Sequence, residues 1–195
     1  AAGVRFGYEG GRGDVLRALS VQVPAEGVTA ILGPNGSGKT TLLRLMLGML
    51  HPSGGEIRLA GRALGRYSRR ERSQAIGLVP QDEHIPFDFS VVEYVLLGRA
   101  PYMGPLEMPG EADTQIALDA LDAVGMGALA YRPLPNLSGG ERQLTMLARA
   151  LAQQPQVLLM DEPAAHLDLS NQGRLLDIVR GLAVRGVTTL SLIHI

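Results

Sequence analysis

The chain has 195 residues, 46% of them hydrophobic and 19% charged, so it is long enough for one domain with a substantial core and too apolar to be disordered. A formal net charge of −1 without a long basic block argues against a nucleic-acid partner, and the lack of cysteine excludes disulfides and thiol chemistry. No apolar run approaches the roughly 18–20 residues that cross a bilayer, so any membrane role must come through a partner.

The first part of the chain alternates strand and turn signals. Residues 1–30 are rich in strand formers, and the glycine cluster at 9–14 predicts a hairpin turn. Residues 28–32 are a short apolar run with β-branched side chains, which predicts a buried strand. Residues 41–48 are apolar and close on glycine, which predicts a helix.

The loop between this strand and this helix fits G-x-x-x-x-G-K-[ST], a phosphate-binding pattern. Glycines let successive backbone N–H groups turn inward around phosphates, and the helix N-terminus adds partial positive charge. Lys39 is expected to reach the β- and γ-phosphates, and the Thr40 hydroxyl to hold Mg²⁺. A chance glycine turn is the alternative, which the flanking strand and helix disfavour. The sequence therefore predicts a site for a nucleoside triphosphate, made by Gly33, Pro34, Asn35, Gly36, Ser37, Gly38, Lys39 and Thr40.

The middle of the chain changes character. Residues 51–55 break the helix, and 56–59 and 75–80 predict two further strands. The arginines between residues 66 and 72 predict a solvated helix face, with an anion site as the alternative. From 82 to 135 prolines and glycines separate helical patches such as 91–97 and 114–124, and no good strand candidate occurs.

Residues 137–141 admit two interpretations that can both hold. Ser138 and Glu141 form S-x-x-E, a capping box for a helix that runs to Gln153. Gly139 and Gly140 leave the first N–H groups of that helix open to an anion, with the helix dipole behind them. Because one phosphate site already lies at 33–40, this second anion site suggests a second subunit.

Two adjacent carboxylates end a fully apolar run. Residues 157–160 predict a strand of a parallel sheet, and Asp161 and Glu162 follow at its carboxyl end, where ligands gather in open α/β sheets. Asp161 is expected to bind Mg²⁺ through water, and Glu162 to polarise the water that attacks the γ-phosphate. The alternative is a strand that ends in solvated acids.

Together these segments resemble the motifs of ABC-type ATPases over nearly the whole chain. The matching motifs are Tyr8 as the aromatic that stacks on adenine (or a strand core residue), 33–41 including Thr41 as the Walker A loop, Gln81 as the Q-loop glutamine, 137–143 as the signature, 158–163 as the Walker B strand and 165–168 as the D-loop. The resemblance implies an α/β fold: a P-loop, RecA-like core (1–82 and 156–195), with an antiparallel β subdomain, and an inserted helical subdomain (83–155).

The resemblance also implies a division of labour. Glu162 activates water, and Gln81 senses the γ-phosphate and joins Thr40 and Asp161 around Mg²⁺. Two subunits would form a head-to-tail homodimer, with each ATP between one Walker A loop and the partner's Ser138, Gly139, Gly140 and Glu141.

Within the family, residues 97–102 and 162–172 resemble the importer ATPases for ferric siderophores, haem and cobalamin. This implies permease subunits, a substrate-binding protein that acts through them, and a peripheral place on the cytoplasmic face of the bacterial inner membrane. Phe87, Phe89 and Tyr102 are expected to contribute to permease docking. A non-transport ABC ATPase, such as a translation or DNA-maintenance factor, is the alternative, and an ATP-dependent dimerisation module is the third hypothesis.

Both ends of the chain suggest truncation. It begins on Ala1 rather than Met, and directly enters a predicted strand. His194 lies about where the family has a histidine that contacts the γ-phosphate, but Ile195 stands where aspartate is expected. Residues 190–195 also resemble the translated transposase end used in sequencing libraries, in which case the position of His194 is a coincidence.

Overall fold

The computed structural model describes residues 1–10, 13–83, 88–165 and 167–194, and for His194 the backbone alone. Its centre is a parallel sheet in the order β3-β9-β8-β7. These strands are β3 (Val28–Gly33), β7 (Ile76–Val79), β8 (Val157–Asp161) and β9 (Thr188–His194). Strands β3 and β8 were predicted as apolar runs at 28–32 and 157–160, and β7 falls inside the strand predicted at 75–80.

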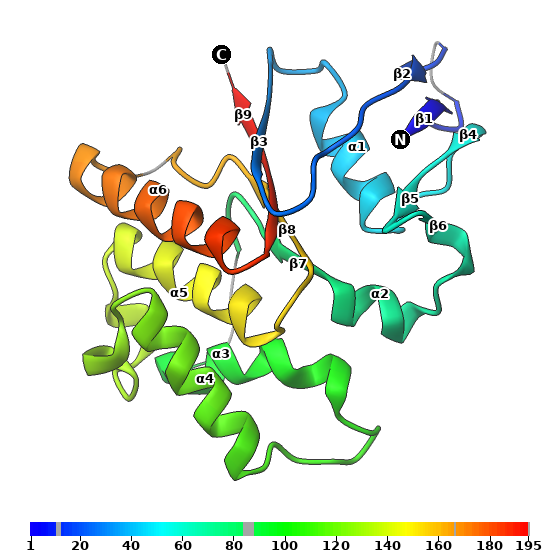
Figure 1. The fold of residues 1–195 in the computed structure, drawn as a ribbon. Coiled ribbons are helices and arrows are strands. Elements are labelled where there is room, and N and C mark those ends of the chain that lie inside the picture. Colours follow the sequence, from blue (N-terminus) through cyan, green and yellow to red (C-terminus); the bar gives the residue numbers. More distant parts are fainter. Residues whose placement is uncertain (11–12, 84–87, 166, 195) are drawn as a thin grey trace.

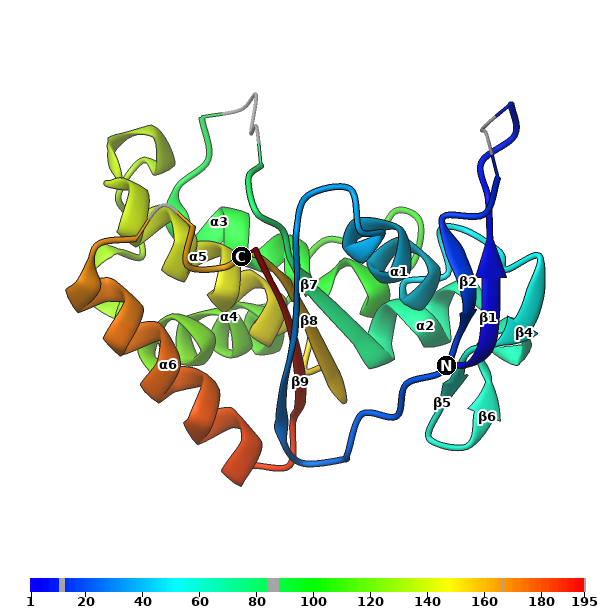
Figure 2. The same ribbon diagram turned by 90° about the horizontal axis from the view of Figure 1, so that it is seen from above.

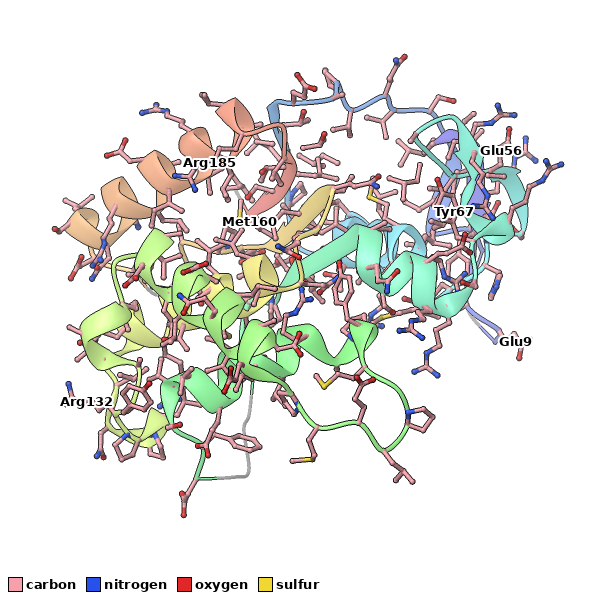
Figure 3. All side chains as sticks on the ribbon, turned by 60° about the horizontal axis from the view of Figure 1, so that its bottom comes forward. Glu9, Glu56, Tyr67, Arg132, Met160 and Arg185 are labelled. Atoms are coloured by element: carbon pink, nitrogen blue, oxygen red, sulfur yellow. The ribbon has the colours of Figure 1, made fainter. Side chains whose placement is uncertain are left out.

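Successive side chains of β8 point to opposite faces of this sheet, and each face has its own apolar core. Leu158 and Met160 pack in one core with helix α5 (Gly139–Ala152), whereas Leu159 packs in the other with helix α1 (Lys39–Met46). Figure 1 shows α1 on one side of the sheet and α5 with α6 (Leu169–Val184) on the other. In Figure 3, Met160 lies near the middle of the molecule, while Glu9 and Arg132 lie towards the outside.

A small antiparallel unit lies beside α1 (Figure 2). It consists of β1 (Ala2–Phe6), β2 (Leu16–Leu19) and β4 (Gly54–Glu56) in the order β2-β1-β4, next to the pair β5 (Arg58–Leu59) and β6 (Arg62–Ala63). The hairpin predicted at 9–14 joins β1 to β2, although residues 11–12 lie outside the described part of the chain.

One predicted strand, 56–59, is divided between β4 and β5. Gly55 has a φ of +74°, and a Cβ there would clash with the backbone of Ala2 and Gly3, so β4 pairs closely with β1 through a glycine. The chain then turns at the buried Ile57 and pairs with β6 instead. A sequence pattern of four residues does not reveal this change of partner.

The arginine-rich segment is helical, as expected, but its face is not purely solvated. Helix α2 (Arg69–Ala75) begins at a capping box between Ser68 and Glu71. Arg70 donates hydrogen bonds to the backbone oxygens of Pro101 (3.0 Å) and Tyr102 (2.8 Å), so α2 also holds the helical layer.

That helical layer contains α3 (Val91–Leu96), α4 (Glu111–Ala123) and α5 around a shared apolar core, which confirms the two predicted helical patches to within three residues. Short 3₁₀ turns lie between them, at Leu97–Tyr102, Gly127–Leu129 and Leu134–Asn136, and another, Leu64–Arg66, precedes α2. Within the described part of the chain, no helix combines the length and apolar character needed to cross a membrane.

Candidate functional site

The predicted phosphate loop joins β3 to α1, and its conformation depends on glycine. Gly36 and Gly38 have φ values of +77° and +91°, in the left-handed region that favours glycine. A Cβ at Gly38 would also lie 2.9 Å from Cδ2 of Leu16. Gly38 is the N-cap of α1 and offers no side-chain cap, so the first N–H groups of the helix face the loop.

Lys39 supplies the positive charge of this loop. Its Nζ donates hydrogen bonds to the backbone oxygens of Gly33 (2.6 Å) and Pro34 (3.0 Å), so the side chain folds back over the loop. These carbonyls hold the ammonium group where phosphate oxygens can replace them as acceptors. The loop therefore offers an anion a cradle of N–H groups with one cation across it.

Tyr8, which lies beyond the end of β1, contacts helix α1. Its hydroxyl lies 3.2 Å from Oγ1 of Thr41, which is buried, and its ring packs edge-on against Phe6 with centroids 5.0 Å apart. The hydrogen bond with Thr41 lowers the pKa of Tyr8, and Arg44 adds to this effect. Tyr8 is 42% exposed, so an aromatic ligand above the loop can reach it.

The two carboxylates lie at the end of β8. Burial raises the pKa of Asp161, the negative charge of Glu162 raises it further, and the nearby cations Lys39 and Arg44 oppose both effects. Asp161 thus lies in the field of the phosphate loop, a partly buried carboxylate that gains from a cation.

Glu162 leaves the strand in an unusual conformation. Its φ is +46°, which is rare for a residue with a side chain, and its backbone N–H donates to the oxygen of Leu192 on β9 (2.9 Å). Such strain is found at functional sites more often than elsewhere. The turn redirects the chain immediately after Asp161, while the hydrogen bond keeps Glu162 at the carboxyl end of β8.

Gln81 meets Glu162 across two neighbouring strands. Gln81 follows β7, which pairs with β8, and its Nε2 lies 3.3 Å from Oε2 of Glu162 although 81 residues separate them. The structure thus places the Walker A loop, Asp161, Glu162 and Gln81 at the carboxyl ends of β3, β8 and β7 in one parallel sheet.

The signature residues lie elsewhere. Ser138 is the N-cap of α5; its N–H donates to Oε2 of Glu141 (2.8 Å), and its Oγ accepts from the N–H of Glu141 (3.3 Å). These hydrogen bonds hold the pKa of Glu141 below its usual range. A Cβ at Gly139 would meet open space, and one at Gly140 would meet Asn171 of α6. The sheet separates α5 from α1 (Figures 1 and 2), so one chain does not bring these residues to its own phosphate loop.

Several predicted residues cannot be placed. Phe87 and His166 of the D-loop lie outside the described residues, as does the side chain of His194. The backbone of His194 pairs with Gly33 in the register of β9 and β3. Leu190 and Leu192 are buried in β9.

The oxygen donors near the loop suit Mg²⁺ better than other common metals. Among the described residues there is no cluster of three His, Cys, Asp or Glu side chains that could hold a metal by itself. Mg²⁺ needs no such cage, because it keeps waters and binds one or two protein oxygens plus substrate phosphates. The Thr40 hydroxyl in the first turn of α1, the desolvated carboxylate of Asp161 and the Gln81 amide oxygen fit that pattern.

Sequence reasoning missed two residues near the site. Arg44 acts electrostatically on both Tyr8 and Asp161, and its place one helical turn beyond Thr40 was the available signal. Gln172 on α6 donates to the backbone oxygens of Ala164 (3.4 Å) and Leu167 (3.0 Å), which closes the D-loop. No local sequence pattern predicts that contact.

Comparison with known proteins agrees with this geometry. The model of the ABC transporter family matches residues 16–165. The chain is 44% identical over 187 residues to the hemin import ATP-binding protein HmuV of Gloeobacter violaceus, covering 92% of this chain and 67% of that protein. A solved metal-chelate type ABC transporter in an inward-facing conformation is 35% identical, with a TM-score of 0.85 over 98% of this chain and 71% of its own. A dimeric bacterial ABC transporter cassette is 27% identical, with a TM-score of 0.85 over 100% of this chain and 87% of its own.

Proposed function

The chain belongs to the ABC transporter family, and from its site geometry we propose that it is the ATP-hydrolysing subunit of an importer for haem or another iron chelate. ABC ATP-binding proteins are ATPases, and the relatives of this chain are transporter ATP-binding subunits. The observation that carries the catalytic proposal is the contact between Gln81 and Glu162 beside the phosphate loop. The hemin and metal-chelate relatives support the choice of cargo, and cobalamin remains a third candidate.

Each residue of the cluster has a proposed role in hydrolysis. The N–H groups of the phosphate loop and Lys39 bind the phosphate chain, and Tyr8 stacks on adenine. Thr40, Asp161 and Gln81 would hold Mg²⁺, which when bound neutralises charge on the β- and γ-phosphates. Glu162 accepts the proton of the attacking water, and Gln81 orients its carboxylate through their hydrogen bond.

The catalytic assignment is tested by Glu162→Gln in the full-length protein. This variant keeps the shape of the side chain but removes the base, so hydrolysis should fall roughly 10²–10⁴-fold while ATP affinity is retained. The Lys39→Ala variant should instead lose ATP affinity itself, measured by calorimetry. Full turnover in the Glu162→Gln variant would remove Glu162 from the catalytic role.

We further propose that the working unit is a head-to-tail homodimer. Gly139 and Gly140 present open N–H groups next to Ser138 at the N-terminus of α5, across the sheet from the chain's own phosphate loop. The signature residues of a partner subunit can approach that loop. Glu141 holds the start of α5 in place through its capping box with Ser138. The dimeric cassette of the same fold supports this arrangement.

The proposed partners are permease subunits at the cytoplasmic face of the bacterial inner membrane, with a substrate-binding protein acting through them. Phe89 packs against the helical core, and the hydroxyl of Tyr102 donates to the backbone oxygen of Gln153 (2.8 Å), so both are largely engaged within the chain. Leu106 and Met108, which are 99% and 81% exposed on the loop before α4, are better placed to contact a permease. A sequencing read through the neighbouring genes tests the importer role: adjacent permease and binding-protein genes would support it, and an isolated gene would favour a non-transport ABC ATPase.

A further inference from the structure

A cluster of polar side chains lies next to the loop that carries Gln81, and the proposed mechanism of hydrolysis gives none of them a role. Glu83 lies two residues after Gln81, and it meets Tyr94 of α3 and Arg149 of α5. We propose that Glu83 is a positioning residue: by tying the loop to α3 and α5 through Tyr94 and Arg149, it sets the contact between Gln81 and Glu162. This inference rests on the proposed role of Gln81 in hydrolysis.

Both oxygens of the Glu83 carboxylate are engaged. The Tyr94 hydroxyl donates to Oε2 (2.6 Å), Nη1 of Arg149 donates to Oε1 (3.0 Å), and Nη2 of Arg149 lies 2.8 Å from Oε2. The guanidinium also lies over the Tyr94 ring, 4.9 Å from its centroid. A two-point contact with a planar guanidinium fixes direction as well as distance, so Glu83 is held in one orientation.

The cluster is sheltered from water. Tyr94 is only 1% exposed, and the side chains of Glu83 and Arg149 are 29% and 21% exposed. Removing one partner of such a sheltered pair leaves the other charge poorly solvated, so the pair resists separation more than a surface ion pair does.

The distance along the chain makes this anchor relevant to Gln81. Two residues span at most about 7 Å of backbone, so fixing Glu83 restricts where Gln81 can lie. The carboxylate of Asp82, between them, accepts the N–H of Glu83 (2.8 Å), which stiffens the link. Gln81 itself is exposed and reaches Glu162 by a long hydrogen bond of 3.3 Å, so its position depends on how its backbone is held.

The helices to which Glu83 is bonded, α3 and α5, are held in place by close packing. Tyr94 packs in the helical core with Leu144, Leu147 and Ala148 of α5. A Cβ at Gly98 would clash with the backbone oxygen of Arg149, so the turn after α3 and helix α5 are in close contact. Helix α5 begins at Ser138. Glu83 therefore connects Gln81, which acts on the ATP of its own subunit, to α5. The N-terminus of α5 is the part proposed to contact the partner's ATP.

The test compares Glu83→Gln with a matched ion-pair variant in the full-length protein. Asp113→Asn is the control, because Asp113 pairs with the buried Arg99 (2.9 Å) in the same helical layer but lies away from the Gln81 loop. We expect Glu83→Gln to lower kcat about tenfold with KM for ATP changed less than twofold, since a ~1 Å misplacement of a catalytic group costs about 10²-fold and a smaller one costs less. Asp113→Asn should lower the unfolding temperature without changing kcat.

The decisive readout is the double variant with Gln81→Ala. If Glu83 acts through Gln81, the pair of changes should be no slower than Gln81→Ala alone, whereas independent effects would multiply. Tyr94→Phe, which leaves the ion pair in place, provides a milder variant if Glu83→Gln unfolds, and it should show the same dependence on Gln81. Multiplying effects, or a kcat of Glu83→Gln within twofold of the parent, would overturn the role of Glu83 alone. An unimpaired Gln81→Ala variant would overturn the proposed role of Gln81, and this inference with it.

Discussion

At the scale of single residues, the site depends on groups held in conformations that they would not adopt elsewhere. Glu162 has a φ of +46°, and Asp161 before it is a partly buried carboxylate next to a second one. Contacts from neighbouring strands, such as the hydrogen bond from the N–H of Glu162 to the backbone oxygen of Leu192, offset the energetic cost of both. These costs suggest that the residues are kept for chemistry rather than for stability.

Asp161→Asn should therefore stabilise the nucleotide-free protein while it impairs Mg²⁺-dependent hydrolysis. The pKa of Asp161 is raised in the folded state from 3.8, so its protonated form stabilises the fold below that pH, and this contribution is lost as the pH rises through the folded pKa. The asparagine variant should melt at a higher temperature than the parent at pH 7, and the difference should vanish below about pH 4. Equal melting temperatures at pH 7 would contradict the desolvation of Asp161.

At the scale of elements, helix starts serve both folding and function. Helices α2, α3 and α5 each begin at a serine capping box, at Ser68, Ser90 and Ser138. The three boxes share the two reciprocal hydrogen bonds between serine and glutamate, and in the box at Ser90 the hydroxyl also donates to Oε2 of Glu93 (2.6 Å). They should therefore contribute similarly to stability. Only the box at Ser138 is proposed to meet a nucleotide.

This symmetry provides a matched comparison of Ser138→Ala with Ser90→Ala. Each should lower the free energy of unfolding by about 1 kcal/mol, the usual cost of losing a serine N-cap, measured by urea denaturation. Hydrolysis should fall at least tenfold in Ser138→Ala, which removes the proposed contact of Ser138 with the partner's ATP, and should stay near the parent rate in Ser90→Ala. Equal hydrolysis by the two variants would restrict Ser138 to capping.

At the scale of the whole molecule, the separation of α5 from the phosphate loop predicts that two subunits share each site. Lys39→Ala and Ser138→Arg should each be inactive alone, because every site lacks one half. Mixed in equal amounts, half of the dimers pair the two variants, and each such dimer has one intact site out of two. The mixture should therefore recover about a quarter of the parent ATPase rate. No recovery after mixing and subunit exchange would contradict the shared site.

The division into a core of 1–82 and 156–195 and a helical subdomain of 83–155 remains a proposal at this scale. The apolar core of the helical layer includes residues of α3, α4 and α5, but also Leu158 on β8 and Val179 on α6. The helical layer and the sheet therefore share one packed core, which would have to shear if the subdomain moves.

The motifs, the α/β class and most of the local elements could be predicted from the sequence alone. A glycine pattern, an N-cap or an apolar strand depends on residues a few positions apart, so each can be recognised locally. The family assignment follows from the order of those motifs, and the comparisons confirm it.

The contacts between residues far apart in the sequence could not be predicted in this way and are seen only in the folded chain. The contacts of Gln81 with Glu162, Tyr8 with Thr41 and Glu83 with Arg149 each join segments at least 33 residues apart. The contact of Gln81 with Glu162 depends on the strand order β3-β9-β8-β7, which places the carboxyl ends of β7 and β8 side by side. Strand order is fixed by packing two apolar cores on either side of the sheet, and that is a property of the whole chain rather than of any local pattern.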